Sequence, residues 1–270
     1  MNSPASPLSL QSGDRPILVG MVHLQALPGS PGYGGSLDRV LDAARRDAAA
    51  LVEGGADAVM VENFNDVPFH RTRVPRITVS AMTAAVLAVR DVAGRTPVGV
   101  NVLRNDGRAA LAIAFTAGCP FIRVNVLAGA RVTDQGVIEG IAADLLRDRR
   151  ALGAEAVQVW ADVDVKHSRP LGSAGPDDLE REVEDLRDRA LADAVIVSGS
   201  GTGKPTAIDK IARVREAAGA MPVIVGSGVT LASLAAMRPL ASGVIVGTAL
   251  KEDGRVSADR VRRFAERLRG

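Results

Sequence analysis

The chain has 270 residues, enough for one large α/β domain or two ordinary ones, and its 47% hydrophobic content is ample for a buried core. Its 33 basic and 31 acidic residues leave a formal charge of +2 with the signs interspersed, which argues against nucleic acid or an anionic membrane surface as a partner. No apolar run reaches the roughly 18 residues that a membrane-spanning helix needs.

Residues 1–15 lack both the basic start and the long apolar middle of a signal peptide. We therefore expect a disordered N-terminal tail, followed by one folded domain over 16–270, in a cytoplasmic protein. The single cysteine, Cys119, cannot form an internal disulfide and lies beside a predicted strand, which indicates a core thiol in a reducing compartment.

From residue 16 onward, short β-branched runs alternate with longer amphipathic segments, a pattern typical of parallel strands linked by helices. The predicted strands are 17–24, 58–63, 97–103, 121–127, 156–163, 194–199, 222–228 and 243–248. The predicted helices are 37–53, 78–93, 107–117, 137–152, 177–191, 206–218 from a Thr206 cap, 231–238 from a Thr230 cap, and 257–268. Eight strand–helix pairs in a chain near ~250 residues favour a single (β/α)8 (TIM) barrel, with an open doubly wound sheet as the alternative.

In such a barrel the functional site lies where the strands end, at the C-terminal face. The loops after the first two predicted strands, 25–36 and 64–78, are long and rich in Gly, Pro and Arg, whereas the third and fourth loops are predicted to be short. The two long loops are candidates either for lids or for a subunit interface. By analogy with other barrels we expect a homo-oligomer.

The fifth predicted strand and its end read AVQVWADVDVKHSRPL (156–171). Strand alternation places its valines on one face and its polar residues on the other. The same alternation applied to the other strands predicts seven polar side chains that point into the barrel near its mouth: Glu62, Asn101, Arg123, Asn125, Asp162, Asp164 and Ser198. Arg123 is interpreted as neutralising one of these acids within a buried network.

The candidate catalytic residues follow from this set. Asp162 or Asp164 would be the general base or charge stabiliser, Lys166 or His167 the acid, and Glu62 a second carboxylate. A Schiff base at Lys166 would need a lowered pKa, and adjacent carboxylates would oppose that, so proton transfer or hydrolysis is preferred. Glu62, Asp162, Asp164 and His167 also offer ligands for a divalent metal, although they lack any tight zinc spacing, and no other cofactor is indicated.

Three strand ends in the second half of the chain are rich in glycine. They contain Gly199, then Gly226, Ser227 and Gly228, and finally Gly247 and Thr248. Glycine lets backbone N–H groups approach an anion, a following helix would add its dipole, and barrels that bind phosphate use the loops after strands 7 and 8. These turns therefore predict a phosphate site.

The segment SGSGTGKPT (198–206) is not a nucleotide-binding P-loop, because Ser198 stands at its first glycine position and Pro205 follows Lys204. Nor is it a dinucleotide fingerprint, since the third glycine is missing. Lys204 is either a cation for a substrate phosphate or a solvated loop lysine. His23 follows the first strand in ambiguous register and is either a site residue or a histidine of the rim, whereas His70 is expected on the surface.

Taken together, the motifs GMVHLQALPGSP, DAVMVENFNDVPF, VGVNVLRND, FIRVNV, WADVDVKHS, VSGSGTGKP and GSGVT resemble the BtpA/SgcQ family of (β/α)8 proteins over about residues 16–265. The resemblance adds Asn63, Asp66 and Asn105 to the mouth residues and assigns them no chemical role. It implies a role either in photosystem I biogenesis or in sugar metabolism.

Two functions follow. The first is an enzyme that acts on a small phosphorylated metabolite, a sugar phosphate or nucleoside phosphate, through acid/base isomerisation, lyase chemistry or glycosidic hydrolysis. The alternative is a non-catalytic assembly or stability factor of the photosystem I type. Inward-facing carboxylates favour the enzyme, because a scaffold has no use for buried charge.

Overall fold

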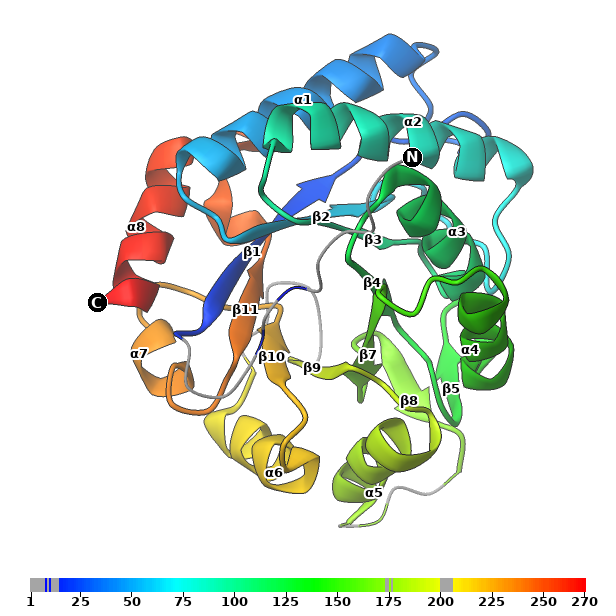
Figure 1. Ribbon diagram of the computed structural model, residues 1–270, viewed down its shortest axis with the longest axis vertical. Coiled ribbons are helices and arrows are strands. Elements are labelled where there is room, and N and C mark those ends of the chain that lie inside the picture. Colours follow the sequence, from blue (N-terminus) through cyan, green and yellow to red (C-terminus); the bar gives the residue numbers. More distant parts are fainter. Residues whose placement is uncertain (1–7, 9, 11–14, 173–174, 176, 200–205) are drawn as a thin grey trace.

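The computed structural model describes residues 8, 10, 15–172, 175, 177–199 and 206–270. Within these residues, eight parallel strands close into a barrel in the order β1-β11-β10-β9-β7-β4-β3-β2 (Figure 1). Strand β1 pairs with β2 on one side and with β11 on the other, so the sheet has no free edge. The prediction of a (β/α)8 barrel is confirmed, and the open sheet is excluded.

The barrel strands are short and almost entirely buried. They are β1 (Ile17–His23), β2 (Ala58–Glu62), β3 (Val98–Asn101), β4 (Phe121–Val124), β7 (Gln158–Val163), β9 (Ala194–Ser198), β10 (Val223–Gly226) and β11 (Gly243–Val246). The helices are α1 (Leu37–Glu53), α2 (Arg76–Ala93), α3 (Gly107–Ala117), α4 (Ala142–Ala151), α5 (Asp178–Glu184) with a π-helical turn at Asp185–Arg189, α6 (Ile208–Ala218), α7 (Leu234–Met237) and α8 (Ala258–Arg269).

Strand alternation divides the hydrophobic side chains into two cores. Outward-facing side chains such as Val59, Val100 and Ile122 pack beneath the helices in one large cluster, which also holds the buried Cys119 predicted as a core thiol. Inward-facing side chains fill the barrel, where the rings of Phe121 and Trp160 stack with centroids 4.1 Å apart. The inner cluster fills the lower barrel and leaves the C-terminal end to polar groups.

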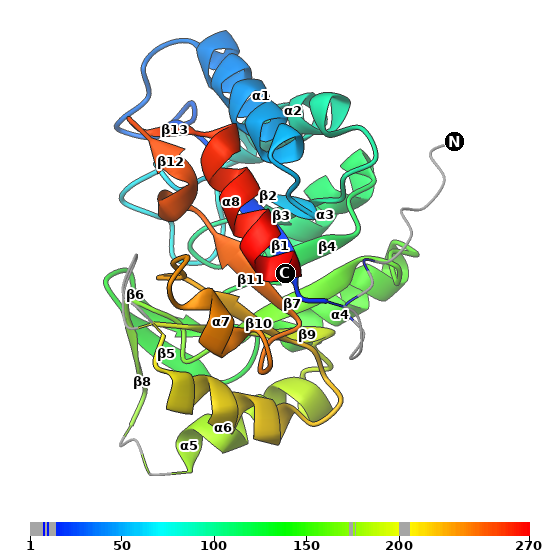
Figure 2. The same ribbon diagram turned by 90° about the vertical axis from the view of Figure 1, so that its left-hand side faces the viewer.

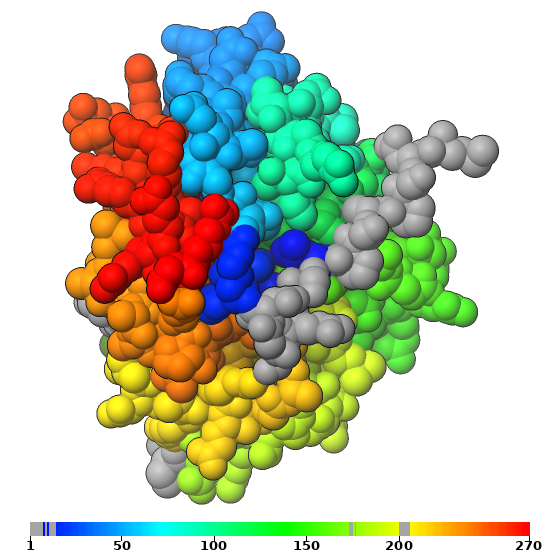
Figure 3. Space-filling model, turned by 60° about the vertical axis from the view of Figure 1, so that its left-hand side comes forward, coloured from blue at the N-terminus to red at the C-terminus, as the bar shows by residue number. Residues whose placement is uncertain are grey.

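The outer layer of helices closes where the last helix meets the first. Figures 2 and 3 show α8, drawn in red, lying alongside α1, drawn in blue, and the two helices are in contact. Helix α1 begins at the predicted residue because the Ser36 side chain accepts a hydrogen bond from the amide of Arg39. None of the helices in the described part of the chain is both long enough and apolar enough to cross a membrane.

The fourth loop differs from its prediction. Instead of a short turn it carries a hairpin of β5 (Ala130–Thr133) and β6 (Gly136–Glu139), and β8 (Ser168–Pro170) adds to β5 as a third strand. The helix predicted from residue 137 therefore begins only at Ala142. The composition of residues 136–141 is compatible with either a helix or a strand. Pairing with β5 makes residues 136–139 a strand.

Two further expectations are wrong. The helix predicted over 231–238 is only the four-residue α7, and α6 begins after Ala207 without a side-chain cap, so the Thr206 cap was wrong. Leu10, placed in the N-terminal tail, is buried in the inner cluster, and the carbonyl of Leu8 accepts a hydrogen bond of 3.1 Å from Gln158. These two residues cover the lower end of the barrel.

Candidate functional site

Polar residues end four adjoining strands on the inner face. The register aligns His23 with Glu62, Glu62 with Asn101, and Asn101 with Arg123, so their side chains share one level of the barrel. Asp162 is aligned with Ile196 of the inner core and so also faces inward. These residues face inward as strand alternation predicts, and the register places His23 on the same inner face.

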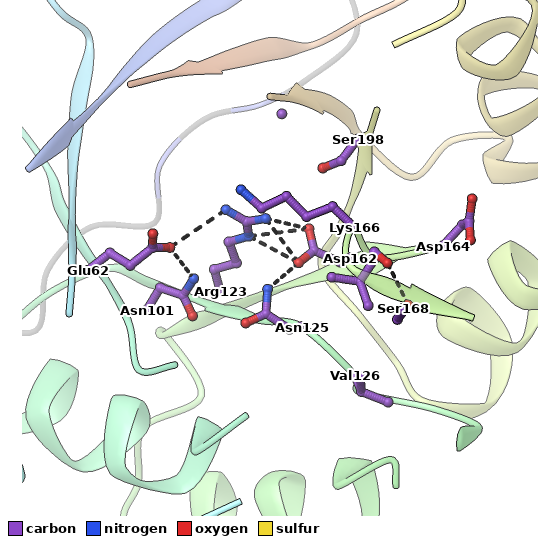
Figure 4. A network of polar contacts seen from close by, with 12 residues as sticks. Glu62, Asn101, Arg123, Asn125, Val126, Asp162, Asp164, Lys166, Ser168 and Ser198 are labelled. Atoms are coloured by element: carbon purple, nitrogen blue, oxygen red, sulfur yellow. Dashed lines mark hydrogen bonds and ion pairs between the residues drawn. The ribbon is translucent and has the colours of Figure 1, made fainter. Parts of the chain in front are cut away.

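Arg123 and Asp162 form a buried ion pair (Figure 4). Nη2 of Arg123 lies 2.9 and 3.0 Å from the two Asp162 carboxylate oxygens, and the side-chain amide of Asn125 donates to the same carboxylate. Arg123 also lies 3.9 Å from Glu62. The interpretation of Arg123 as the partner of a buried acid is confirmed. Asp162 lines neither of the two cavities at the barrel mouth. It is therefore poorly placed to act on a ligand as the predicted general base.

Glu62 is the acid that faces the open mouth. Asn101 donates a 2.6 Å hydrogen bond to it. Burial alone would raise the pKa of Glu62, but His23, Arg123 and Lys166 lower it below its ordinary value. Burial lowers the pKa of His23 to about 4, so His23 is neutral near pH 7 and Arg123 is the main cation that keeps Glu62 ionised.

His23 connects several groups at the rim. Its Nε2 lies 3.8 Å from Glu62, its ring stacks on Phe64 with centroids 4.3 Å apart, and its Nδ1 lies 3.3 Å from the amine of Lys251. It therefore belongs to the mouth, whereas His70 is exposed, as expected. A neutral imidazole beside an ionised carboxylate can accept a proton or pass one on.

Asp164 does not face the barrel, and the prediction that it does is wrong. Strand β7 ends at Val163, and Asp164 has a positive φ of 45°, which takes it out of the strand alternation. Its carboxylate pairs with Arg131 of the hairpin and lies 2.7 Å from the amine of Lys210 on α6. Figure 4 shows it pointing away from the Arg123 network. Asp164 thus fixes the hairpin and α6 to the end of β7.

Lys166 returns to the mouth two residues later. Its side chain runs alongside Arg123 (Figure 4), and Arg104 donates a 2.6 Å hydrogen bond to its backbone carbonyl. Burial lowers the pKa of the Lys166 amine below its ordinary value, and the charge of Arg123 adds to this effect. His167 is exposed, with a positive φ of 58°, and lies at the outer edge of the site.

Two cavities open at this face and meet at the same four side chains. The first, of about 220 Å³, is lined by His23 and by the turns after β10 and β11. The second, of about 490 Å³, is lined by His167, Arg104, Asn125 and parts of the loops after β2 and β3. Glu62, Phe64, Arg123 and Lys166 line both cavities. A ligand could therefore place one end in each cavity and its middle against these groups.

The first cavity is where the sequence predicted a phosphate. Ser227, Gly228, Gly247 and Thr248 all line it. A side chain at Gly247 would meet His23, with a Cβ only 2.9 Å from the imidazole Cε1, so glycine is needed for the close approach. Long helices do not follow these turns, because α7 has four residues and Thr248–Leu250 is a single 3-10 turn. The cations near this cavity are instead Arg123 and Lys166.

The other predicted binding residues have different surroundings. Gly226 is buried against Ile196 and Ser198, and the hydroxyl of Ser198 has no hydrogen-bond partner among the described residues. Gly199 is buried directly after β9. Lys204 lies outside the described residues, so its predicted role stays a prediction.

Asn63, Asp66 and Asn105 hold loops rather than line either cavity. Asn63 accepts a 2.7 Å hydrogen bond from the amide of Leu103, and Asp66 accepts one of the same length from Leu27. Asn105 bonds both backbone groups of Val126. These side chains fix the positions of the first three strand-end loops. They support the site without facing its cavities.

Sequence reasoning missed three groups that the structure brings to the mouth. Arg104 lies three residues after the end of β3 and directly after the predicted strand 97–103, and a cation at a strand end was the signal that could have found it. Phe64 follows β2 and carries the stacking contact with His23. Lys251 begins β12 (Lys251–Glu252), which pairs with β13 (Arg255–Val256), and nothing in its local sequence indicated contact with a histidine of β1.

The predicted metal ligands are not gathered into one set. Asp162 is covered by Arg123, Asp164 faces away, and Glu62 lies beside His23. In the part of the chain that the structure describes, no group of three His, Cys, Asp or Glu side chains is arranged to hold a metal ion.

Comparison with known proteins agrees with this architecture. The BtpA family matches residues 14–270. An uncharacterized protein of Thermococcus kodakarensis is 49% identical over 257 residues, covering 94% of this chain and 95% of its own. The photosystem I biogenesis protein BtpA of Synechocystis is 45% identical over 240 residues, covering 89% and 82%.

Among solved structures, N-(5'-phosphoribosyl)anthranilate isomerase from Pyrococcus furiosus has the same fold. It superposes with a TM-score of 0.58 at 15% identity, over 94% of this chain and 98% of the isomerase. At that identity the likeness concerns the fold. The match over almost the whole length and the identities to both relatives lead to one conclusion: this chain belongs to the BtpA family.

Proposed function

We propose that the protein is an enzyme acting on a small phosphorylated metabolite, such as a sugar phosphate or nucleoside phosphate. The observation that carries the proposal is the pair of cavities joined at Glu62, Arg123 and Lys166. One cavity is lined by the glycine-containing turns after β10 and β11, the place where barrels that bind phosphate hold it. The similar fold of an enzyme whose name contains a phosphoribosyl group supports the same class of ligand.

In this proposal the phosphate lies against Ser227–Gly228 and Gly247–Thr248, and the rest of the metabolite reaches into the second cavity. Glu62, ionised and facing both cavities, is the base. Neutral His23 accepts or relays the proton, and Arg123 stabilises negative charge as it develops. Isomerisation, lyase chemistry and glycosidic hydrolysis are all served by such a set.

The test is a thermal-shift and turnover panel of sugar phosphates and nucleoside phosphates, with their unphosphorylated counterparts as controls. A ligand at 100 times its Kd stabilises the folded state by about 2.7 kcal/mol, which raises Tm by roughly 5 to 10 °C for a chain of this size. The proposal fails if no phosphorylated compound stabilises or is turned over.

A matched pair of variants locates the phosphate. Ser227 has a positive φ of 66°, which Asp and Asn tolerate better than most residues. Ser227→Asp adds a negative charge to the first cavity and should abolish stabilisation by phosphorylated compounds. Ser227→Asn has nearly the same shape without the charge and should keep most of it. Equal behaviour of the two variants would place the phosphate elsewhere.

The second candidate function is assembly or stabilisation of photosystem I, favoured by the 45% identity to the Synechocystis protein that carries this name. It predicts that Glu62→Gln leaves complementation of a Synechocystis strain lacking that protein intact. Loss of complementation by Glu62→Gln, with normal protein levels, would favour the enzyme.

A further inference from the structure

Lys166 occupies the junction of the two cavities. Four side chains line both cavities, and Lys166 is the amine among them. Its neighbours there are the carboxylate of Glu62 and the guanidinium of Arg123. A ligand with its phosphate in the first cavity would carry its next few carbon atoms past this amine.

The amine has no direct partner in the described part of the chain, although acidic residues flank it in sequence. Asp162 is taken up by Arg123 and Asn125, and Asp164 by Arg131 and Lys210. Neither of these two carboxylates forms an ion pair with the amine of Lys166. Burial and the adjacent Arg123 lower the pKa of the amine, and together they outweigh the rise that Glu62 and Asp162 cause. A lowered pKa favours the neutral amine that a Schiff base requires.

Lysine is rare in this chain. Only four of the 33 Lys and Arg residues are lysines: Lys166, Lys204, Lys210 and Lys251. Lys210 is held by Asp164 and by the carbonyl of Ser198, and Lys251 contacts His23. The remaining cations are arginines, which stay protonated and do not form imines under these conditions. A lysine at residue 166 thus supplies a nucleophile where arginine would supply only charge.

We propose that Lys166 forms a Schiff base with a carbonyl carbon of the phosphorylated substrate, which is an aldehyde or ketone phosphate; this inference rests on the proposed function of the site. The neutral amine adds to the carbonyl carbon and gives a carbinolamine. Loss of water then leaves a protonated imine. This iminium draws electrons from a bond to the neighbouring carbon, either C–H or C–C.

The released proton has an acceptor within the same set. Glu62 is ionised and lines both cavities beside Lys166. It can take the proton from the carbon next to the imine, in an isomerisation that inverts this carbon, or from a hydroxyl in a carbon–carbon cleavage that releases a carbonyl fragment. Returning the proton to the enamine carbon, on the opposite face in the first case, restores the imine, and adding water to the imine regenerates the amine and releases the product. Arg123 opposes protonation of the free amine before attack.

The test uses pyridoxal 5'-phosphate, a phosphorylated aldehyde, with borohydride to reduce any imine to a stable secondary amine. Peptide mass mapping is unambiguous because the chain has four lysines. In the wild-type protein we expect Lys166 to carry more label than the other three lysines together, and inorganic phosphate to compete. Lys166→Arg, which keeps the charge, should lose this label, while the matched variant Lys251→Arg should keep it.

Label spread evenly over the lysines, or undiminished total label in Lys166→Arg, would overturn the Schiff base. Stabilisation or turnover by phosphorylated compounds without selective labelling would also overturn it, while leaving the proposed function in place. Selective labelling of Lys166 by unphosphorylated pyridoxal to the same extent would support the lysine chemistry and count against the phosphate site. Because the wild-type map alone decides selectivity, the test does not depend on the variants folding.

Discussion

Replacing Arg123 with methionine tests whether its buried ion pair with Asp162 stabilises the barrel. The change removes the cation that contacts Asp162 at 2.9 to 3.2 Å and Glu62 at 3.9 Å. The side chain of Asp162 is fully buried, so water cannot replace the lost contacts. Removing one partner of a buried pair costs about 3 to 5 kcal/mol, which for a chain of this size lowers Tm by roughly 6 to 20 °C.

The assay is urea unfolding followed by circular dichroism, with calorimetry for Tm, on Arg123→Met, Asp162→Asn and the double variant. The free energy of unfolding of the double variant should fall by less than the sum of the two single-variant decreases. We expect a difference of about 0.5 to 3 kcal/mol, because the two side chains interact directly. Arg45→Met is the control, since its pair with Asp42 is exposed and is worth less than about 1 kcal/mol. Two results would contradict this prediction. One is strictly additive decreases in the free energy of unfolding, and the other is a decrease in Arg123→Met no larger than in Arg45→Met.

Two further predictions concern titrating groups. Because burial lowers the pKa of His23 to about 4, its NMR resonances should not titrate between pH 5.5 and 8. Its contribution to the free energy of unfolding should decline as pH falls from about 6.5 toward 4. An NMR titration midpoint near 6.5 would contradict the buried position of this side chain. Burial tends to raise the pKa of Asp164, but Lys210 and Arg131 lower it overall, so Asp164 stabilises above its unfolded pKa and this is lost as pH falls through the folded value. With that side chain 44% exposed, Asp164→Asn should cost less than about 1 kcal/mol at pH 7. The urea midpoints of variant and wild type should converge in acid once the carboxyl group is protonated in the folded state, and a gap that persists there would argue against the ion pairs.

Alternation along single strands was enough to predict much of the inner site. Glu62, Asn101, Arg123 and Asp162 all lie on the face that their valine neighbours leave free. The prediction worked because a two-residue period is a local property, and because a closed barrel turns the common face of every strand inward. The prediction failed for Asp164, because this residue lies beyond the end of β7 and its positive φ breaks the alternation.

The sequence did not predict which charged residues pair with one another. Nothing local distinguishes Asp162, which pairs with Arg123 from β4, from Asp164, which pairs with Arg131 from a hairpin where a short loop was predicted. Those pairings in turn leave the amine of Lys166 without an ion-pair partner in the described part of the chain, while burial lowers its pKa.

The sequence by itself determined the (β/α)8 barrel, its order of elements and the inward face of its strands, because periodicity and turn chemistry are written into neighbouring residues. Only the tertiary structure decided which acids were neutralised, that His23 contacts Lys251, and that two cavities meet at Lys166. Electrostatic environment depends on groups far apart in the chain, and these come within a few ångströms of one another only when the barrel closes.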